Sequence, residues 1–196
     1  MYHERVRRCL MILETKDLII RPSVWADLEY FYPWEQGPAV TEFFSIRDGQ
    51  TMEDCAKKFI GDEEDPGAMQ FTICRKENGP EGVVCGEPMG RIVLADIIEG
   101  WKAELWRIYI ADTKLRGKGL GKQAMRAIMD YCFGELKLER MYLDHYTGNP
   151  ASFMYLSLGF QYEGVLRQNC RKNGVLYDVH LMSMLRPEYE ALYGAK

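Results

Sequence analysis

The sequence lacks several features that define particular classes of protein. It has no apolar run of transmembrane length, so it predicts no membrane-spanning helix. Its six cysteines form no Cys-x-x-Cys pair and have no metal-ligand spacing with the three histidines, so we expect reduced thiols and no metal site. The formal net charge of −4 argues against a general nucleic-acid-binding protein. These absences favour a cytoplasmic protein with neither a membrane nor a nucleic acid as partner.

The length and composition that remain are those of one globular domain. A chain of 196 residues, 47% hydrophobic and 28% charged, is long enough to bury a substantial core. No internal repeat or linker divides it. Residues 1–10 carry a basic cluster and precede a second methionine, so we expect a flexible N-terminal arm or the product of an upstream start codon. Residues 11–196 are then a single domain.

The pattern of apolar residues predicts an α/β fold with a mixed sheet and helices on both faces, in the order β-α-α-β-β-β-α-β-α-β-β. Residues 61–67 hold four acidic residues and a proline, which predicts an exposed loop. A helix separates the fourth and fifth strands, which predicts that they run parallel. Strands are expected at residues 18–22, 69–75, 90–98, 103–112, 140–146, 161–169 and 175–184, and helices at about 25–33, 51–60, 119–133 and 149–159. The second helix opens on Thr51 and Asp54, which are close to a capping box, and residues 172–174 predict a hairpin turn. Residues 103–112 alternate regularly between two largely apolar faces, and the third helix carries an apolar i, i+4 stripe of Leu120, Ala124, Ile128 and Cys132.

The most informative segment joins the fourth strand to the following helix through a glycine-rich turn. Backbone N–H groups at a helix N-terminus have no helical partner and attract an anion. The glycines let the chain curl around a phosphate, and the basic residues add positive charge. A glycine-rich helix start without a ligand remains the alternative at this point. The segment consists of Arg116, Gly117, Lys118, Gly119, Leu120, Gly121 and Lys122.

Two well-known phosphate motifs do not fit this turn. A Walker loop would need a glycine at Arg116 and a hydroxyl residue at Gln123. The dinucleotide motif would need its third glycine at Lys122. The remaining pattern, Arg-x-x-Gly-x-Gly, resembles the acyl-CoA pyrophosphate loop of the GCN5-related N-acetyltransferase (GNAT) superfamily.

Other segments resemble the same family in the same order along the chain. Residues 155–160 resemble its Tyr-x-x-x-Gly-Phe motif, and residues 18–22 resemble its first strand. Residues 185–189, after an apolar strand, resemble the end of the ribosomal-protein and spermidine acetyltransferase branch. The resemblance covers residues 11–190. It implies the GNAT fold, in which the fourth and fifth strands splay apart.

The resemblance also implies where acetyl-CoA binds. The backbone of Ile108, Tyr109 and Ile110 would pair with the pantetheine like an added strand, and N–H groups of residues 116–121 would hold the pyrophosphate. Family members usually place an asparagine at the head of the fourth helix. Asn149 stands one residue closer to the Gly-Phe pair than that asparagine, so its contact with the cofactor is left open.

Acetyl transfer to an amine needs a group that removes a proton from the amine and one that protonates the leaving thiolate. By resemblance, Glu104 is the candidate base, acting directly or through water, and Tyr155 is the candidate acid. The alternatives are a surface glutamate and a packed aromatic ring, with the amine proton lost to bulk water. His145 and Cys132 are weaker candidates.

The sequence says less about the acceptor than about the cofactor. Aromatic residues at 30–34, with Glu35 and Glu42 nearby, form either a cationic acceptor pocket or ordinary core beside a solvated loop. We expect an acetyl-CoA-dependent N-acetyltransferase without a metal. Its acceptor would be a ribosomal-protein N-terminus, a polyamine or another small amine. A non-catalytic acyl-CoA sensor is the alternative, and a homodimer is compatible with the sequence.

Overall fold

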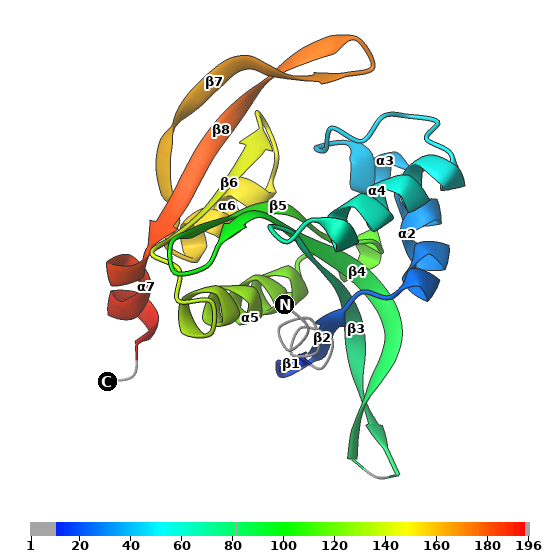
Figure 1. Cartoon of the computed structure of the whole chain (residues 1–196), viewed down its shortest axis with the longest axis vertical. Helices are drawn as coiled ribbons and strands as arrows, with labels where there is room; N and C mark the ends of the chain where they lie inside the picture. Colours follow the sequence, from blue (N-terminus) through cyan, green and yellow to red (C-terminus); the bar gives the residue numbers. More distant parts are fainter. Residues whose placement is uncertain (1–10, 81, 195–196) are drawn as a thin grey trace.

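The computed structural model describes residues 11–80 and 82–194, so the predicted N-terminal arm lies outside the described residues. The described strands form one sheet of eight, in the order β1-β2-β3-β4-β5-β6-β8-β7 (Figure 1). Neighbouring strands are antiparallel except β5 and β6, which are parallel as predicted. The strands are β1 Leu13–Glu14, β2 Leu18–Pro22, β3 Met69–Gly79, β4 Gly82–Ile98, β5 Lys102–Ile110, β6 Arg140–Tyr146, β7 Gln161–Lys172 and β8 Val175–Leu185.

Helices cover both faces of the sheet, as the sequence predicted. The α5 helix packs on one face, and α2 and α4 pack on the other (Figure 1). None of the helices within the described ranges is long and apolar enough to cross a membrane. The helices are α2 Leu28–Trp34, α3 Pro38–Thr41, α4 Met52–Glu64, α5 Leu120–Gly134, α6 Ala151–Ser157 and α7 Arg186–Tyr193, with 3-10 turns η1 Trp25–Asp27 and η2 Thr113–Leu115.

The larger core lies between α5 and the sheet. Ala124, Ile128 and Cys132 are spaced four residues apart on α5 and are fully buried against the strands. Arg126 and Asp130 form an i,i+4 ion pair on another face of the helix. This arrangement is the amphipathic helix that the sequence pattern predicted.

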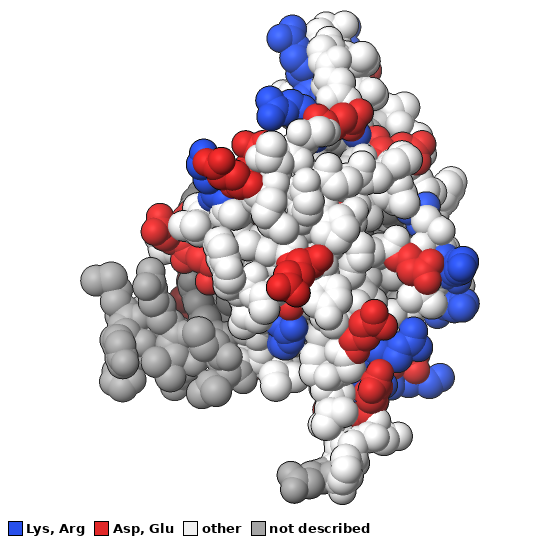
Figure 2. All heavy atoms as spheres, turned by 90° about the vertical axis from the view of Figure 1, so that its right-hand side faces the viewer, with Lys and Arg blue, Asp and Glu red and all other residues white. Residues whose placement is uncertain are grey.

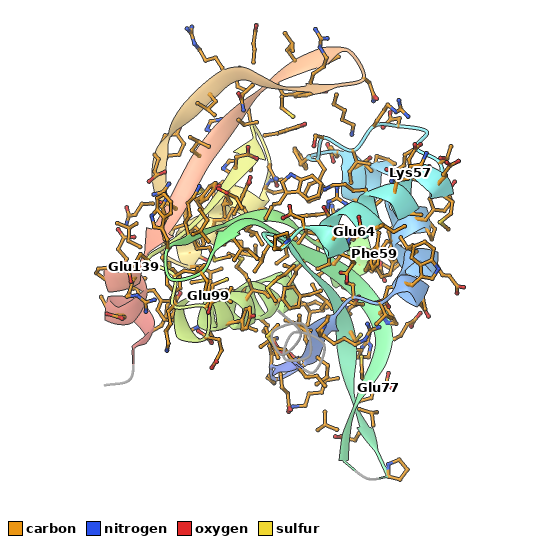
Figure 3. The ribbon with its side chains drawn as sticks, in the orientation of Figure 1. Lys57, Phe59, Glu64, Glu77, Glu99 and Glu139 are labelled. Atoms are coloured by element: carbon orange, nitrogen blue, oxygen red, sulfur yellow. The ribbon has the colours of Figure 1, made fainter. Side chains whose placement is uncertain are left out.

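A smaller core joins α2 and α4 on the opposite face. Phe59 of α4 is buried with Leu28, Phe31 and Cys55 and lies on the side of α4 toward α2 (Figure 3). The outer surface of these helices carries interspersed acidic and basic side chains (Figure 2). The two helices therefore form a layer whose inner side is apolar and whose outer side carries charged side chains of both signs.

The predicted loop at residues 61–67 is wrong in its first half. The α4 helix begins at the predicted capping box, where Thr51 Oγ1 accepts from the Asp54 N–H at 3.1 Å, and continues through Gly61 to Glu64. Asp62 is buried and pairs with Lys58 one turn earlier, which supports helix there. The helix ends because Asp65 precedes a proline and adopts extended backbone.

Several further elements differ from prediction, since β1 and α3 have no counterpart among the expected strands and helices. Strands β3 and β4 extend to Gly79 and from Gly82, so their hairpin projects from the sheet around Glu77 (Figures 1 and 3). The sequence pattern did not predict α7 at all. The β7–β8 turn agrees with prediction, because Asn173 and Gly174 both have positive φ, as the preferred hairpin turn requires.

Candidate functional site

A cavity of about 660 Å³ opens where the parallel strands β5 and β6 separate. The two strands pair only from Lys102 to Glu104 on β5 and from Arg140 to Tyr142 on β6. Beyond these pairs the strands diverge, so the predicted splay is present. Strand β5, residues 39–45, the start of α5, the end of β6 and α6 line the cavity. Its size is in the usual range for small-molecule sites.

A bulge in β5 determines which side chains of this strand face the cavity. Val93 of β4 pairs with Arg107 and the next residue, Leu94, pairs with Leu105, so Trp106 is an extra residue on β5. The bulge reverses the alternation, and Leu105 and Ile108 both pack in the α5 core. The regular alternation expected for this strand is therefore wrong at Trp106.

The glycine-rich turn lies at one end of the cavity. Gly117 and Gly119 have φ of 75° and 78°, and Gly119 immediately precedes α5, as an anion-binding helix start requires. The Arg116 N–H already donates to the Thr113 carbonyl at 3.1 Å, so it is not free for a ligand. Among the predicted cofactor residues, Lys118 does not line the cavity. Those that do are Ile108, Tyr109, Ile110, Arg116, Gly117, Gly119, Leu120, Gly121, Lys122 and Asn149.

Two carboxylates lie in the wall where the strands separate. Glu104 is half-buried on β5, and Asp144 of β6 is open to the cavity. Burial raises the pKa of Glu104, and the negative charge of Asp144 raises it further. Loss of hydration between the cavity walls likewise raises the pKa of Asp144. Sequence reasoning passed over Asp144 as a proton acceptor, because only the register of β5 and β6, in which Tyr142 pairs with Glu104, brings the two carboxylates to one wall.

Tyr155 of α6 lines the same cavity and is 6% exposed. Among the residues that the structure describes, none forms a hydrogen bond with its hydroxyl. Burial raises the pKa of the phenol, and the charge of Asp144 adds to this effect. The phenol therefore keeps its proton at neutral pH and directs an unsatisfied hydroxyl at the cavity.

Asn149 has a structural task at the start of α6. Its Oδ1 accepts a hydrogen bond from the Ala151 N–H at 2.9 Å, which satisfies one of the free donors of that short helix. The side chain also lines the cavity. The asparagine therefore fixes the beginning of the helix that carries Tyr155.

The weaker catalytic candidates have other roles. Cys132 is fully buried in the α5 core, and burial raises the pKa of its thiol. His145 is buried, its Nδ1 is bonded to the Tyr146 carbonyl at 3.0 Å, and its ring stacks on His180 with centroids 5.2 Å apart. Neither side chain lines the cavity.

None of residues 30–35 lines the cavity, which favours the core alternative over the cationic acceptor pocket. Glu35 is 3% exposed, and its Oε1 accepts from Arg107 Nη1 at 2.7 Å, Arg91 Nη1 at 2.9 Å and the Tyr109 hydroxyl at 2.9 Å. Burial alone would raise the pKa of Glu35, but the charges of Arg107 and Arg91 outweigh it and lower the pKa. This carboxylate is already paired, and Phe31 is fully buried beneath Arg91.

Other aromatic residues line the cavity instead. Phe43 and Phe44, from the segment after α3, lie in the cavity wall with Trp106 and Tyr146. Sequence reasoning missed Phe43, Phe44 and the whole Glu35 network. No local pattern indicates that Glu35, Arg91 and Arg107 meet, because they are 56 and 72 residues apart.

A mixed sheet that splits at its parallel strands, with a glycine-rich helix start at the split, is the arrangement that the resemblance to the GNAT superfamily predicted. The chain belongs to the GNAT family, because the model of the acetyltransferase (GNAT) domain matches residues 17–161. The protein is an N-acetyltransferase, in agreement with the prediction from its motifs.

Relatives and solved structures agree with this assignment. The uncharacterized N-acetyltransferase p20 of Bacillus licheniformis is 30% identical over 181 residues, 90% of this chain and 97% of that protein. The spermidine N(1)-acetyltransferase of Escherichia coli is 25% identical over 174 residues, 88% of each chain. The spermidine N-acetyltransferase of Vibrio cholerae, solved with CoA and spermine, superposes with a TM-score of 0.74 at 22% identity and covers 89% of this chain and 99% of that one.

Proposed function

We propose that the protein transfers an acetyl group from acetyl-CoA to a primary amine by direct attack in a ternary complex. The observation that carries this proposal is the cavity at the strand split. It has a glycine-rich helix start at one end and holds Glu104, Asp144 and Tyr155. A phosphate site, a proton acceptor and a proton donor thus share one space.

The pantetheine would lie along β5. The backbone of Ile108, Tyr109 and Ile110 borders the cavity on the side where β6 has moved away, so its groups can pair with the pantetheine amides. The pyrophosphate would lie on the N–H groups of Gly117 to Gly121, with Arg116 and Lys122 nearby. The crystal structure of the Vibrio cholerae enzyme, which contains CoA, supports an acyl-CoA as the co-substrate.

The chemistry needs one group that accepts a proton from the amine and one that donates a proton to the leaving thiolate. A primary amine with a pKa near 10.4 must lose its proton before its nitrogen can attack, and Glu104, whose pKa is raised, is placed to accept that proton directly or through water. The nitrogen then forms a bond to the acetyl carbon, and the carbon–sulfur bond breaks. Tyr155 gives its proton to the departing thiolate of CoA, and the remaining surplus proton on the attached nitrogen restores the phenol, directly or through water. The products are an acetamide and free CoA.

The acceptor class is the open part of this proposal. The spermidine acetyltransferase of Escherichia coli supports a polyamine, and the C-terminal motif supports a ribosomal-protein N-terminus. Another small amine fits the same cavity. The cytoplasmic location and the homodimer stay predictions.

A screen of amines for free-thiol release tests the proposal. Polyamines, amino acids, aminoglycosides and ribosomal-protein N-terminal peptides are incubated with acetyl-CoA, and calorimetry measures acetyl-CoA binding in parallel. Thiol release with one of these amines is the expected result. Tight acetyl-CoA binding without any acceptor would favour the non-catalytic sensor, and absence of binding would overturn both functions.

A further inference from the structure

Arg107 presents an incompletely paired guanidinium at the acceptor side of the cavity. It is 6% exposed and belongs to the cavity wall. Its Nη1 donates to Glu35 Oε1 at 2.7 Å. Its Nε is buried without a partner, and Nη2 forms no hydrogen bond with any residue that the structure describes. Because Nε is buried, Nη2 is the unpaired nitrogen that a ligand in the cavity could reach.

The network behind the cavity has more positive than negative charge. Arg91 and Arg107 share the single carboxylate of Glu35, and all three side chains are buried. Two guanidinium groups and one carboxylate leave a net charge of +1. The Nη2 of Arg91 donates to the carbonyl oxygen of the Gln70 side chain, whereas its Nε, like that of Arg107, is buried without a partner. The unpaired Nη2 is therefore what distinguishes Arg107 from Arg91. Unmatched buried charge is costly unless a partner arrives.

The carboxylates of the cavity do not supply that partner. Among the residues that the structure describes, Arg107 forms an ion pair with Glu35 and none with Glu104 or Asp144. The Arg107 guanidinium lies against the ring of Trp106 at 4.5 Å and that of Phe44 at 5.8 Å. The cavity thus has separate positive and negative subsites.

We propose that the acceptor carries a carboxylate as well as its primary amine, and that Arg107 binds this carboxylate. The proposal rests on the N-acetyltransferase function and names the class of its acceptor. The amine would face Glu104 and Asp144, while the carboxylate would accept hydrogen bonds from the unpaired Nη2 group of Arg107. The walls formed by Phe43, Phe44 and Trp106 suit an apolar or aromatic body, so the class is an α-amino acid of that kind.

The same geometry disfavours a polyamine. A polyamine is positively charged along its length, so one of its ammonium groups would face the unpaired guanidinium of Arg107 without a counter-charge. Like charges in a partly dehydrated site repel strongly. A carboxylate in the same place forms charge-assisted hydrogen bonds, which are the stronger kind.

Matched acceptors test the proposal. Initial rates of thiol release are measured for phenylalanine, leucine and methionine, for their carboxamides, and for spermidine. For the wild-type enzyme we expect kcat/KM to be ~10- to 100-fold higher for at least one free acid than for its carboxamide, and higher than for spermidine. In Arg107→Gln the kcat/KM of the free acid divided by that of its carboxamide should fall at least ~10-fold. The acid and the carboxamide differ in amine pKa, but this difference is the same for both enzymes and cancels when their ratios are compared.

Arg91→Gln is the matched control, because Arg91 shares the Glu35 carboxylate but does not line the cavity. Its acid-to-amide ratio should stay within ~3-fold of wild type even if the protein is less stable. If Arg107→Gln fails to fold, Arg107→Lys takes its place with a smaller loss. Equal ratios in wild type and the Arg107 variant, or equal losses in both arginine variants, would overturn the proposal. A wild-type preference for spermidine would overturn it and leave the N-acetyltransferase function intact.

Discussion

Burial acts on Tyr155 and Glu104 in the same direction but with different consequences. It raises the pKa of both side chains. The phenol stays protonated, but the raised pKa also makes it a weaker proton donor, so its proposed role as the acid depends on its place in the cavity wall. The carboxylate becomes a better proton acceptor. The same dehydrated wall thus strengthens the proposed base and keeps the proposed acid protonated.

Replacing Tyr155 by phenylalanine tests the proposed acid. The variant keeps the ring that packs near Phe160 but removes the hydroxyl. We expect kcat to fall ~100- to 1,000-fold, because the thiolate would leave without a positioned proton donor. The dissociation constant of acetyl-CoA, measured by calorimetry, should change little. An unchanged kcat would return Tyr155 to the role of a packed aromatic ring.

Replacing Glu104 by glutamine tests the proposed base. The wild-type rate should fall as pH drops through the raised pKa of Glu104, since protonation removes the base. In Glu104→Gln we expect kcat/KM at neutral pH to fall ~10- to 100-fold, and the acidic limb of its pH profile to disappear. A variant that keeps this limb would assign the titration to another group, with Asp144 the first candidate.

The same variant should be more stable at neutral pH. A carboxyl whose pKa is raised by folding destabilises the native state above its unfolded pKa, and this penalty disappears as pH falls below that value. Removing the charge therefore should raise the melting temperature by ~2 °C at pH 7 and change nothing near pH 3. Lost activity combined with gained stability is the expected result for a functional charge.

At the scale of elements, the sequence predicted the turns and helix starts that depend on residues close together in the chain. Glycines before a helix indicated the turn at Gly119, the Thr51–Asp54 spacing indicated a helix start, and Asn173-Gly174 indicated a hairpin. It could not predict the bulge at Trp106, because which residue is extra depends on the pairing of two whole strands. The Glu35 network depends on three elements meeting and was missed for the same reason.

Strands β4 and β5 approach each other so closely at position 90 that only glycine fits there without a steric clash. A Cβ added at this position of β4 would lie 2.2 Å from the carbonyl oxygen of Tyr109 on β5. Gly90→Ala should therefore push β5 away and destabilise the protein by ~1–3 kcal/mol. Because β5 borders the cofactor cavity, acetyl-CoA affinity should fall as well. Chemical denaturation and calorimetry measure the two effects.

Gly61→Ala is the control for this prediction. Gly61 lies inside α4, and a Cβ there would meet nothing within 4 Å. Alanine favours helix over glycine by about 1 kcal/mol, so this variant should be as stable as wild type or more stable. Equal destabilisation by both alanine variants would contradict the steric explanation for Gly90.

At the scale of the whole molecule, α7 ties together elements from distant parts of the chain. Arg186 donates to Glu139 Oε1 at 2.8 Å and to the carbonyls of Phe133 and Leu138 at 3.1 and 2.6 Å. Tyr189 stacks on Phe133 with ring centroids 4.5 Å apart. The C-terminal segment therefore fixes the end of α5 and the approach to β6.

Arg186→Ala should lower the melting temperature by ~4–8 °C, because two carbonyls and a carboxylate lose a charged donor. Arg47→Ala is the comparison, since Arg47 is 73% exposed and lies 3.7 Å from an exposed carboxylate. An exposed pair of this kind contributes little, so its loss should shift the melting temperature by less than ~2 °C. Similar shifts for both variants in differential scanning calorimetry would contradict the role of α7.

The separation of β5 and β6 gives this sheet an edge in its interior. Every backbone group that faces the gap must find water or a guest, and a bound pantetheine would act as the missing strand. The co-substrate then becomes a folding partner: at a hundredfold excess over its dissociation constant it would add ~2.7 kcal/mol to the free energy of unfolding. We therefore expect the lifetime of the protein against proteases to follow the supply of acyl-CoA, so that scarcity of the acyl donor removes the enzyme that consumes it.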